Sequence, residues 1–470
     1  MRVKHGCGVS ACTATRDVSR QRFAVAVLRS ALEMNLPSDA TGLVLALSGG
    51  ADSACLAFAV SQLGVASVRG LPVRAVHVDH GLQPAAAAFR DACARLCGRL
   101  GLPLEILKVS VPAAGRSVEA AARDARYDAL ARSLTPGECV LTAHHALDQA
   151  ETVLLQLLRG AGLKGLSAMP ACRALGSGWH LRPLLDVSPR ELREFAAAAG
   201  LEALVDPMNS DPRFDRAYLR TQLWPLIEAR WPGAVTALTR TAHHVADAQA
   251  LLDAAAAGAV QALRDGHALS IAGLRLLPEA QQRNALRHWI GTEISGHGTV
   301  LPSTARLSEA LRQCLAAQDD RLPAVVWGEH ALRRYRDRLF VTAAQPPRLH
   351  DRYEWSVHPA ARLDLGPSLG ILSWTAQIGG LDPARLPPTV QVRPRSGGET
   401  LKPHLRARTQ SVQHLLQSLG VLPWMRDAVP LLYVGEQLIA VGDWWLDAGW
   451  CVARPATGVS PEWQDAPHRM

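Results

Sequence analysis

Between about Gly42 and Ala199, short apolar runs alternate with stretches whose apolar residues repeat at helical spacing. The four runs predicted to be strands are Leu43–Leu47, Val73–Val78, Leu104–Val109 and Cys139–Thr142. The stretches predicted to be helices are Ser53–Leu63, Ala85–Leu100, Val118–Leu134 and Asp148–Arg159. This alternation favours a parallel sheet covered by helices, because parallel strands need a crossover connection between them. We therefore expect a doubly wound α/β domain.

The chain has 470 residues, which is too long for one hydrophobic core, so roughly two to four domains are expected. After Pro232 the pattern changes to alanine- and leucine-rich helical stretches, Ala234–Leu263 and Pro278–Ile290, with little strand character until Ala324–Val326 and Arg338–Thr342. We expect a mostly helical middle domain and then a small α+β C-terminal domain. The expected divisions are a poorly defined N-terminal extension at 1–40, the α/β domain at 41–232, the helical domain at 233–345, a linker region at 346–388 and the C-terminal domain at 389–456.

Composition narrows the classes of protein. No apolar run approaches the roughly 20 residues that cross a bilayer, and no secretory h-region is visible near the N-terminus, so a cytoplasmic protein without membrane contact is expected. The nine cysteines are scattered and form no CxxC motif, which indicates reduced thiols rather than a disulfide framework. A formal charge of +8 favours a polyanionic partner. Oligomeric state is left open, with a homodimer among the alternatives.

The segment Ser48-Gly49-Gly50-Ala51-Asp52-Ser53 directly follows the first predicted strand and opens a helix. Two glycines let the backbone turn tightly, and the N-terminus of the helix attracts anions, so this loop is predicted to hold phosphate. The hydroxyls of Ser48 and Ser53 would add donors, and Asp52 is placed to reach a Mg²⁺ ion that bridges phosphates. The alternative is a simple βα turn in which Asp52 or Ser53 caps the helix. The GxxxxGK[ST] motif of a Walker A loop is absent.

The loop resembles the SGGxDS signature of the PP-loop ATP pyrophosphatases, and further motifs resemble the tRNA(Ile)-lysidine synthetases of that superfamily. These motifs follow predicted strands or lie further along the chain: His77–Leu82, Ala143–Thr152, Leu158–Leu166, Arg182–Leu185, Asp206–Asn209, Arg216–Arg220, Arg395–Glu399 and Pro423–Asp427. The resemblance implies a PP-loop fold that binds ATP and Mg²⁺, with tRNA(Ile) bearing a CAU anticodon and L-lysine as substrates. It also implies that the middle and C-terminal domains bind the tRNA.

The resemblance also implies roles for single residues. Ser48, Gly49, Gly50, Ala51, Asp52 and Ser53 would bind ATP, with Asp52 also holding Mg²⁺. Either His144 or His145 would contact nucleotide or substrate, and His144 is the one we assign. Arg123 and Arg126 lie on a predicted helix where an arginine would stabilise negative charge during adenylation, and the choice between them is open. Asp148 would be a second acidic group that holds lysine or metal.

The sequence departs from the family pattern at Leu147, where an aspartate is usual, at Gln83, where an arginine is common, and at Gln413 and His414, where many members carry lysines. Two other functions are alternatives to this reaction. A tRNA thiolase on the same scaffold would need cysteine motifs that the chain lacks. A tRNA-binding protein without catalysis is disfavoured by the intact Ser48–Ser53 loop.

Overall fold

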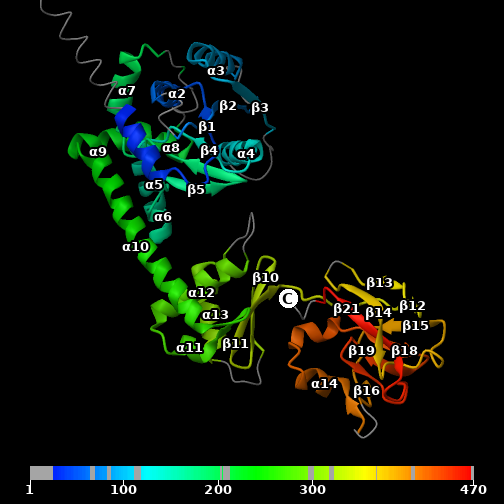
Figure 1. Cartoon of the computed structure of the whole chain (residues 1–470). Helices are drawn as coiled ribbons and strands as arrows, with labels where there is room; N and C mark the ends of the chain where they lie inside the picture. The colour runs from blue at the N-terminus through cyan, green and yellow to red at the C-terminus, as the bar shows by residue number, and fades with distance from the viewer. Residues whose placement is uncertain are drawn as a thin grey trace, which may run out of the picture. The chain divides into compact units, whose positions relative to one another are not determined.

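The computed structural model divides the chain into two compact units, Met1–Leu251 and Leu252–Met470 (Figure 1). It describes residues 25–63, 69–81, 86–110, 118–201, 204, 212–294, 301–316, 322–366, 368–403 and 408–466. Within these residues, no helix is long and apolar enough to cross a membrane.

The first unit is built on a six-stranded sheet with the order β3-β2-β1-β4-β6-β5. Its strands are β1 Gly42–Leu47, β2 Val73–Asp79, β3 Leu104–Lys108, β4 Glu138–Leu141, β5 Cys172–Leu175 and β6 Gly178–Leu181. All neighbouring pairs are parallel except β5 and β6. The predicted doubly wound sheet is confirmed. The β5–β6 hairpin was not predicted, because each strand has only four residues and mixes polar with apolar side chains.

Alternate residues of β1 pack against opposite layers of helices, as the two-residue period of a strand requires. Leu43 and Leu45 belong to a large core formed with α2, α3, α7 and residues 25–35. Val44 belongs to a smaller core with Leu130 of α4. Both sheet faces are therefore covered, which explains why the strands are so apolar. The helices of the first unit are α2 Ala51–Leu63, α3 Ala86–Leu100, α4 Val118–Ser133, α5 Ala146–Leu158, α6 Leu163–Leu166, α7 Pro189–Ala198, α8 Asp215–Tyr218, the π-helix η3 Leu219–Leu223 and α9 Trp224–Arg230.

Residues 25–35 form a helix, although the sequence showed no clear element there. Leu28 and Leu32 are 0% and 1% exposed and pack in the larger core of the sheet. This helix is therefore part of the packed α/β unit. Residues 1–24 of the expected N-terminal extension lie outside the described part of the chain.

The long helix α10 Ala234–Leu263 has the predicted bounds and contains the division between the two units. Beyond it, a five-stranded antiparallel sheet has the order β7-β8-β11-β10-β9. The buried Trp289 of α12 lies in the core of this part. The sequence predicted β9 and β11 but not β8 or β10. The elements are β7 Arg264–Asp265, β8 Ala268–Ser270, α11 Ile271–Arg275, α12 Glu279–Glu293, α13 Thr304–Ala316, β9 Ala324–Trp327, β10 His330–Tyr335 and β11 Arg338–Ala343.

The C-terminal part of the second unit contains a five-stranded sheet, β12-β15-β18-β19-β20, and a three-stranded sheet, β13-β14-β21. Its strands are β12 Tyr353–Ser356, β13 Arg362–Asp364, β14 Ile371–Ile378, β15 Thr389–Arg393, β16 Thr400–Leu401, β17 Gln410–Ser411, β18 Leu431–Val434, β19 Gln437–Val441, β20 Trp445–Leu446 and β21 Thr457–Gln464. Its helices are α14 Val412–Ser418 and the 3₁₀ helix η4 Pro423–Ala428.

The 346–388 segment, expected as a linker region, contributes β12, β13 and β14 to these sheets. The α+β composition of the C-terminal region is confirmed. The predicted domain boundaries stay predictions.

Helix 25–35 gives a test of this packing. We predict that Leu32→Ala lowers the free energy of unfolding by about 2–5 kcal/mol, the range for removing a buried leucine side chain. Met34→Ala is the matched control, because Met34 lies in the same helix and is 76% exposed. Its effect should stay within about 0.5 kcal/mol. Differential scanning calorimetry of the full chain compares the two, and equal shifts would show that the helix is not packed on the sheet.

Candidate active site

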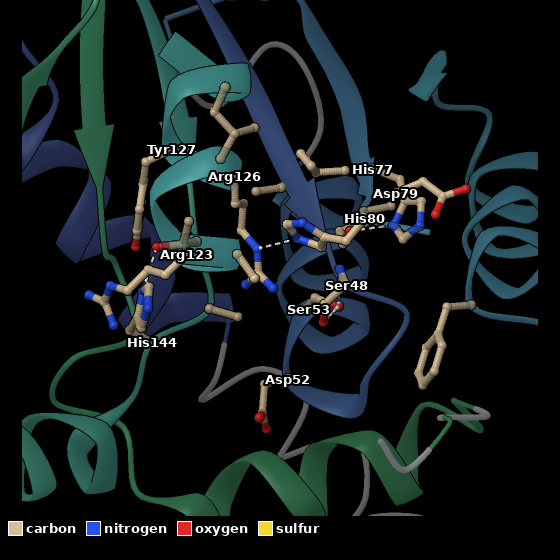
Figure 2. A pocket seen from close by; sticks show the side chains of 18 of the residues that line it. Ser48, Asp52, Ser53, His77, Asp79, His80, Arg123, Arg126, Tyr127 and His144 are labelled. Carbon is tan, nitrogen blue, oxygen red and sulfur yellow. Dashed lines mark hydrogen bonds between the residues drawn. The ribbon is translucent and has the colours of Figure 1, made fainter. Parts of the chain in front are cut away.

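A cavity of about 450 Å³ lies at the carboxyl ends of β1, β2 and β4. In an open α/β sheet this is where ligands bind, because the strand order changes direction there. Four arginines and three aspartates line it: Arg123, Arg126, Arg216, Arg220, Asp52, Asp79 and Asp148. Figure 2 shows side chains from the loop after β1, from the end of β2 and from α4 around this space. The arrangement suits a ligand that carries several negative charges.

The loop from Ser48 to Ala51 requires glycine at its second position for two reasons. Gly49 has a φ of +82°, which favours glycine. A Cβ atom there would also lie 2.9 Å from the Cδ1 atom of Phe89. Helix α2 begins immediately afterwards at Ala51, so its positive end faces the cavity. The local backbone is therefore built for close approach of an anion.

The two serine hydroxyls of the loop contact each other. Ser53 Oγ donates to the Gly50 carbonyl at 3.0 Å and accepts from the Ser48 amide at 3.2 Å. The two Oγ atoms lie 3.1 Å apart, and Ser48 Oγ also accepts from the Gly50 amide at 3.3 Å. Ser53 is buried, whereas Ser48 is exposed. The Ser53 hydroxyl thus bonds within the loop, and Ser48 is the more exposed of the two serines that line the cavity.

Asp52 lies on the first turn of α2, half exposed and facing His145. His145 Nε2 is 3.7 Å from Asp52 Oδ2. Burial raises the pKa of Asp52, His145 opposes this shift, and Asp148 adds to it. A cation bound beside this carboxylate would be stabilised, because the protein itself compensates the charge of Asp52 only weakly.

The pKa of Asp148 is shifted in the opposite direction to that of Asp52. Burial alone would raise its pKa, but His145, Arg216 and His144 outweigh burial and lower it. Its Oδ1 accepts from Arg216 at 3.3 Å and from Arg220 at 3.0 Å. Its Oδ2 accepts from the amide of His145 at 3.0 Å, while the Asp148 amide donates to His145 Nδ1 at 3.4 Å. This reciprocal capping fixes the start of α5 at the cavity.

Glu151, one turn further along α5, is the anchor of both arginines. Its side chain is 0% exposed. Arg216 Nε donates to Glu151 Oε2 at 2.8 Å, and Arg220 Nε donates to Oε1 at 2.7 Å. Since the same arginines also reach Asp148, the four side chains form one ion network that joins α5 to α8 and the π-helix η3.

Helix α4 places two further arginines at the cavity. Arg126 Nε donates to His80 Nε2 at 3.4 Å, a contact drawn in Figure 2. Burial, followed by Arg126, lowers the pKa of His80. The guanidinium carbon of Arg123 lies 5.6 Å from the ring centroid of Tyr127. Both arginines are exposed toward solvent and line the cavity, so the structure does not separate their roles.

His144 lies on the same cavity wall, directly after β4. Its Nδ1 atom is 2.7 Å from Thr142 Oγ1. Burial lowers the pKa of His144 to about 3, and Asp148 only partly opposes this. His144 is therefore a neutral imidazole at physiological pH.

Comparison with known proteins identifies the family. Residues 23–227 match the PP-loop domain, 269–340 match the TilS substrate binding domain, and 390–463 match the TilS substrate C-terminal domain. A tRNA(Ile)-lysidine synthase of Coxiella burnetii is 36% identical over 89% of this chain and 91% of its own length. Those of Alkalilimnicola ehrlichii and Methylococcus capsulatus are 39% and 37% identical, over 86% and 89% of this chain and 90% and 95% of their own lengths. The chain belongs to the tRNA(Ile)-lysidine synthase family.

In this member of the tRNA(Ile)-lysidine synthase family, the predicted site residues lie together. Asp52, Arg123, Arg126, His144 and Asp148 all line one cavity. Ser48 and Ser53 line it too, and Gly49, Gly50 and Ala51 form the backbone between them. The roles assigned to these residues stay predictions.

The sequence placed Glu151, Arg216 and Arg220 within family motifs and His145 as an alternative to His144, but it did not predict the ion network that the two arginines form with Glu151 and Asp148. The signals for this network were the three-residue spacing of Asp148 and Glu151 and the four-residue spacing of the two arginines, each of which places its pair on one helix face. The sequence departure at Leu147 lies between His145 and Asp148 in the first turn of α5. Gln413 and His414 are exposed on α14, whereas Gln83 lies outside the described residues.

The cysteines were interpreted as structural thiols. Among the residues that the structure describes, seven cysteines are free, and five of these are buried. Burial raises the pKa of Cys55, Cys93 and Cys139 to about 12. These thiols are therefore not poised as thiolates, which argues against a sulfur-transfer role for them.

The ion network yields a stability prediction. Glu151→Gln should lower the free energy of unfolding by about 2–5 kcal/mol, because it removes the buried anion that two partly buried arginines share and leaves both with Asp148. Asp215→Asn is the matched control: it breaks the Arg159–Asp215 pair, 3.0 Å long and exposed on both sides, and should cost less than about 1 kcal/mol. Calorimetry of the full chain measures both. Equal effects would mean that Glu151 does not anchor the network.

Proposed function

We propose that this chain is a cytoplasmic enzyme that joins free L-lysine to C2 of the wobble cytidine in tRNA(Ile) with a CAU anticodon, through an adenylated tRNA intermediate. The observation that carries the proposal is the cavity itself. It combines a glycine-rich loop at a helix N-terminus with four arginines and, beside them, two carboxylates of opposite pKa shift. The names of relatives that are 36–39% identical along most of the chain support the same reaction.

In the first step, the C2 carbonyl oxygen of the cytidine attacks the α-phosphorus of ATP. The bond between that phosphorus and the β-phosphate oxygen breaks, and pyrophosphate leaves. The Ser48–Ser53 loop would bind the pyrophosphate portion through its backbone and the helix dipole. Arg123 or Arg126 would stabilise the negative charge that develops on the transferred group.

In the second step, the ε-amine of lysine attacks C2, and AMP leaves with the former carbonyl oxygen. A proton is lost from the amine as the new carbon–nitrogen bond forms. Asp148 would orient the lysine, because its lowered pKa keeps it ionised and able to attract an ammonium group. Arg216 and Arg220 hold this carboxylate in place.

Mg²⁺ fits the residues present at Asp52. The described residues include no cluster of three or more His, Cys, Asp or Glu side chains that could enclose a metal ion. Mg²⁺ in nucleotide sites is usually held by one or two carboxylates together with phosphate oxygens and water, so one half-exposed aspartate beside a phosphate loop suffices. When bound, the ion would neutralise phosphate charge and favour departure of pyrophosphate.

The reaction predicts that purified protein transfers radiolabelled lysine to tRNA(Ile) with a CAU anticodon and releases AMP and pyrophosphate. Asp52→Ala should reduce AMP and pyrophosphate production by at least about 100-fold, the scale of removing an electrostatic stabiliser of the transition state. Asp91→Ala, at an exposed aspartate on α3, is the control and should stay within about twofold of the unaltered chain. Near-normal turnover of Asp52→Ala would refute the role of Asp52, and absence of lysine incorporation by the unaltered chain would refute the reaction.

We also propose that the regions 233–345 and 389–456 bind the body of the tRNA, which the charge of +8 favours. Residues 392–411 form a basic stretch in which one acidic residue, Glu399, stands against five cationic ones: Arg393, Arg395, Lys402, Arg406 and Arg408. Arg393 of this stretch is engaged in contacts within the protein. It contacts Glu436 at 3.1 Å, and its guanidinium carbon lies 4.6 Å from the ring centroid of Tyr433. Arg408 is exposed, and Arg406 lies outside the described residues. A homodimer stays a prediction.

Salt dependence tests this surface. Arg408→Ala should raise the KM for tRNA and flatten the slope of log binding constant against log salt by about 0.7–0.9, the value for one phosphate contact. The KM for ATP should not change. Arg362→Ala, at another exposed arginine of the second unit, is the control. If Arg408→Ala and Arg362→Ala give the same slope as the unaltered chain, Arg408 is not a phosphate contact.

A further inference from the structure

His180 of β6 is a histidine with no exposure to solvent, and two arginines face one of its ring nitrogens. Arg173 Nε is 3.3 Å from His180 Nδ1, and Arg182 Nη2 is 3.1 Å from the same atom. A guanidinium group donates hydrogen bonds and accepts none. The Nδ1 atom must therefore be an acceptor without a proton.

The charge state of His180 fixes where its proton lies. Burial, reinforced by Arg182 and Arg173, lowers its pKa to about 2, so the ring is neutral at physiological pH. A neutral imidazole carries one proton, and with Nδ1 excluded that proton is on Nε2. Nε2 lies 2.8 Å from Thr142 Oγ1, so it donates to that hydroxyl.

The hydroxyl of Thr142 transmits this hydrogen-bond direction from His180 to His144. Its hydroxyl accepts from His180 and has one proton of its own to donate. The other side-chain atom that contacts Thr142 Oγ1 is His144 Nδ1, at 2.7 Å. Thr142 therefore donates to His144 Nδ1, which must be the acceptor. Since His144 is neutral, its proton is on Nε2.

We infer that Arg173, Arg182, His180 and Thr142 form a directed hydrogen-bond chain that presets His144 as an Nε2–H donor in the catalytic cavity. Thr142 and His180 are positioning residues that act through His144. The group that His144 addresses is an oxygen acceptor, either of an ATP phosphate or of the carbonyl being adenylated. This assignment rests on the proposed function and extends it to Thr142, which lines the cavity beside His144, and to His180, which lies behind the cavity wall.

The chain matters because a free neutral imidazole has two tautomers. With the proton on Nδ1, His144 would direct a lone pair toward the ligand oxygen and repel it. The directed chain removes that alternative before any ligand arrives, which is the condition for a preorganised donor. The two arginines supply the direction because they are the members of the chain that cannot reverse their hydrogen bonds.

The first test reads the tautomer directly in the protein without substrates. The full chain is labelled with ¹⁵N-histidine, and the His144 signals, among 17 histidines, are assigned by comparison with His144→Gln. We expect a protonated Nε2 and an unprotonated Nδ1 from pH 6 to 8. Thr142→Val, which keeps the shape of the side chain without the hydroxyl, should give a mixture of tautomers, and Thr142→Ser should restore the single one.

A protonated Nδ1 in the unaltered chain would overturn the inference. So would a His144 that titrates in this pH range, or a Thr142→Val variant with an unchanged His144 tautomer. None of these readings depends on catalysis. They therefore separate failure of this inference from failure of the proposed reaction, which is seen as absence of lysine incorporation by the unaltered chain.

The second test is kinetic. Thr142→Val should lower kcat for tRNA-dependent pyrophosphate release by about tenfold or more, with the 10²–10³-fold effect of complete loss of a preorganised donor as the upper limit. The KM for tRNA should remain unchanged, and Thr142→Ser should recover kcat to within about threefold. A fall in kcat that Thr142→Ser does not rescue would indicate a packing defect and contradict the inference, as would an unchanged kcat in Thr142→Val.

Discussion

The carboxylate of Glu151 on α5 is fully buried and is bound by Arg216 and Arg220, two arginines that line the cavity. An unpaired charge at such a position would be strongly destabilising, so the arginines must be present for α5 to pack as it does. Each arginine also forms an ion pair with Asp148, which restrains it further. One buried charge thus fixes three side chains around the ligand space.

The two cavity carboxylates on α2 and α5 differ although they lie on either side of one histidine. Asp148 is surrounded by cationic groups and amide donors, and its pKa is lowered. Asp52 is partly buried with fewer compensating contacts, and its pKa is raised. His145 contacts both, at 3.5 Å and 3.7 Å. Because of this difference, Asp148 is suited to attract an ammonium group and Asp52 to gain from a bound cation.

Buried polar side chains behind the cavity set the directions of hydrogen bonds within the site. His180 and Arg182 are almost fully buried, yet neither faces the ligand space directly. Buried polar groups are stable when their hydrogen bonds are satisfied, and here satisfaction also imposes a direction on those bonds. The tautomer of His144, which lines the cavity, is therefore set through His180 and Arg182, which do not line it.

The sequence by itself determined the sheet, the phosphate loop and most of the residues that meet at the cavity. These depend on local properties: the apolar period of β1 and β2, the glycine at position 49 with its φ of +82°, and the rule that parallel strands end at one edge. The same local reasoning missed β5 and β6, which are short and mixed in polarity.

Only the tertiary structure decided how Glu151 and His180 act, because their partners are distant in sequence. Glu151 meets Arg216 across 65 residues, and Thr142 meets His180 across 38. The lowered pKa of His180 and the directions of these hydrogen bonds arise from burial and from charges that folding brings together. No spacing along the chain records either of these effects.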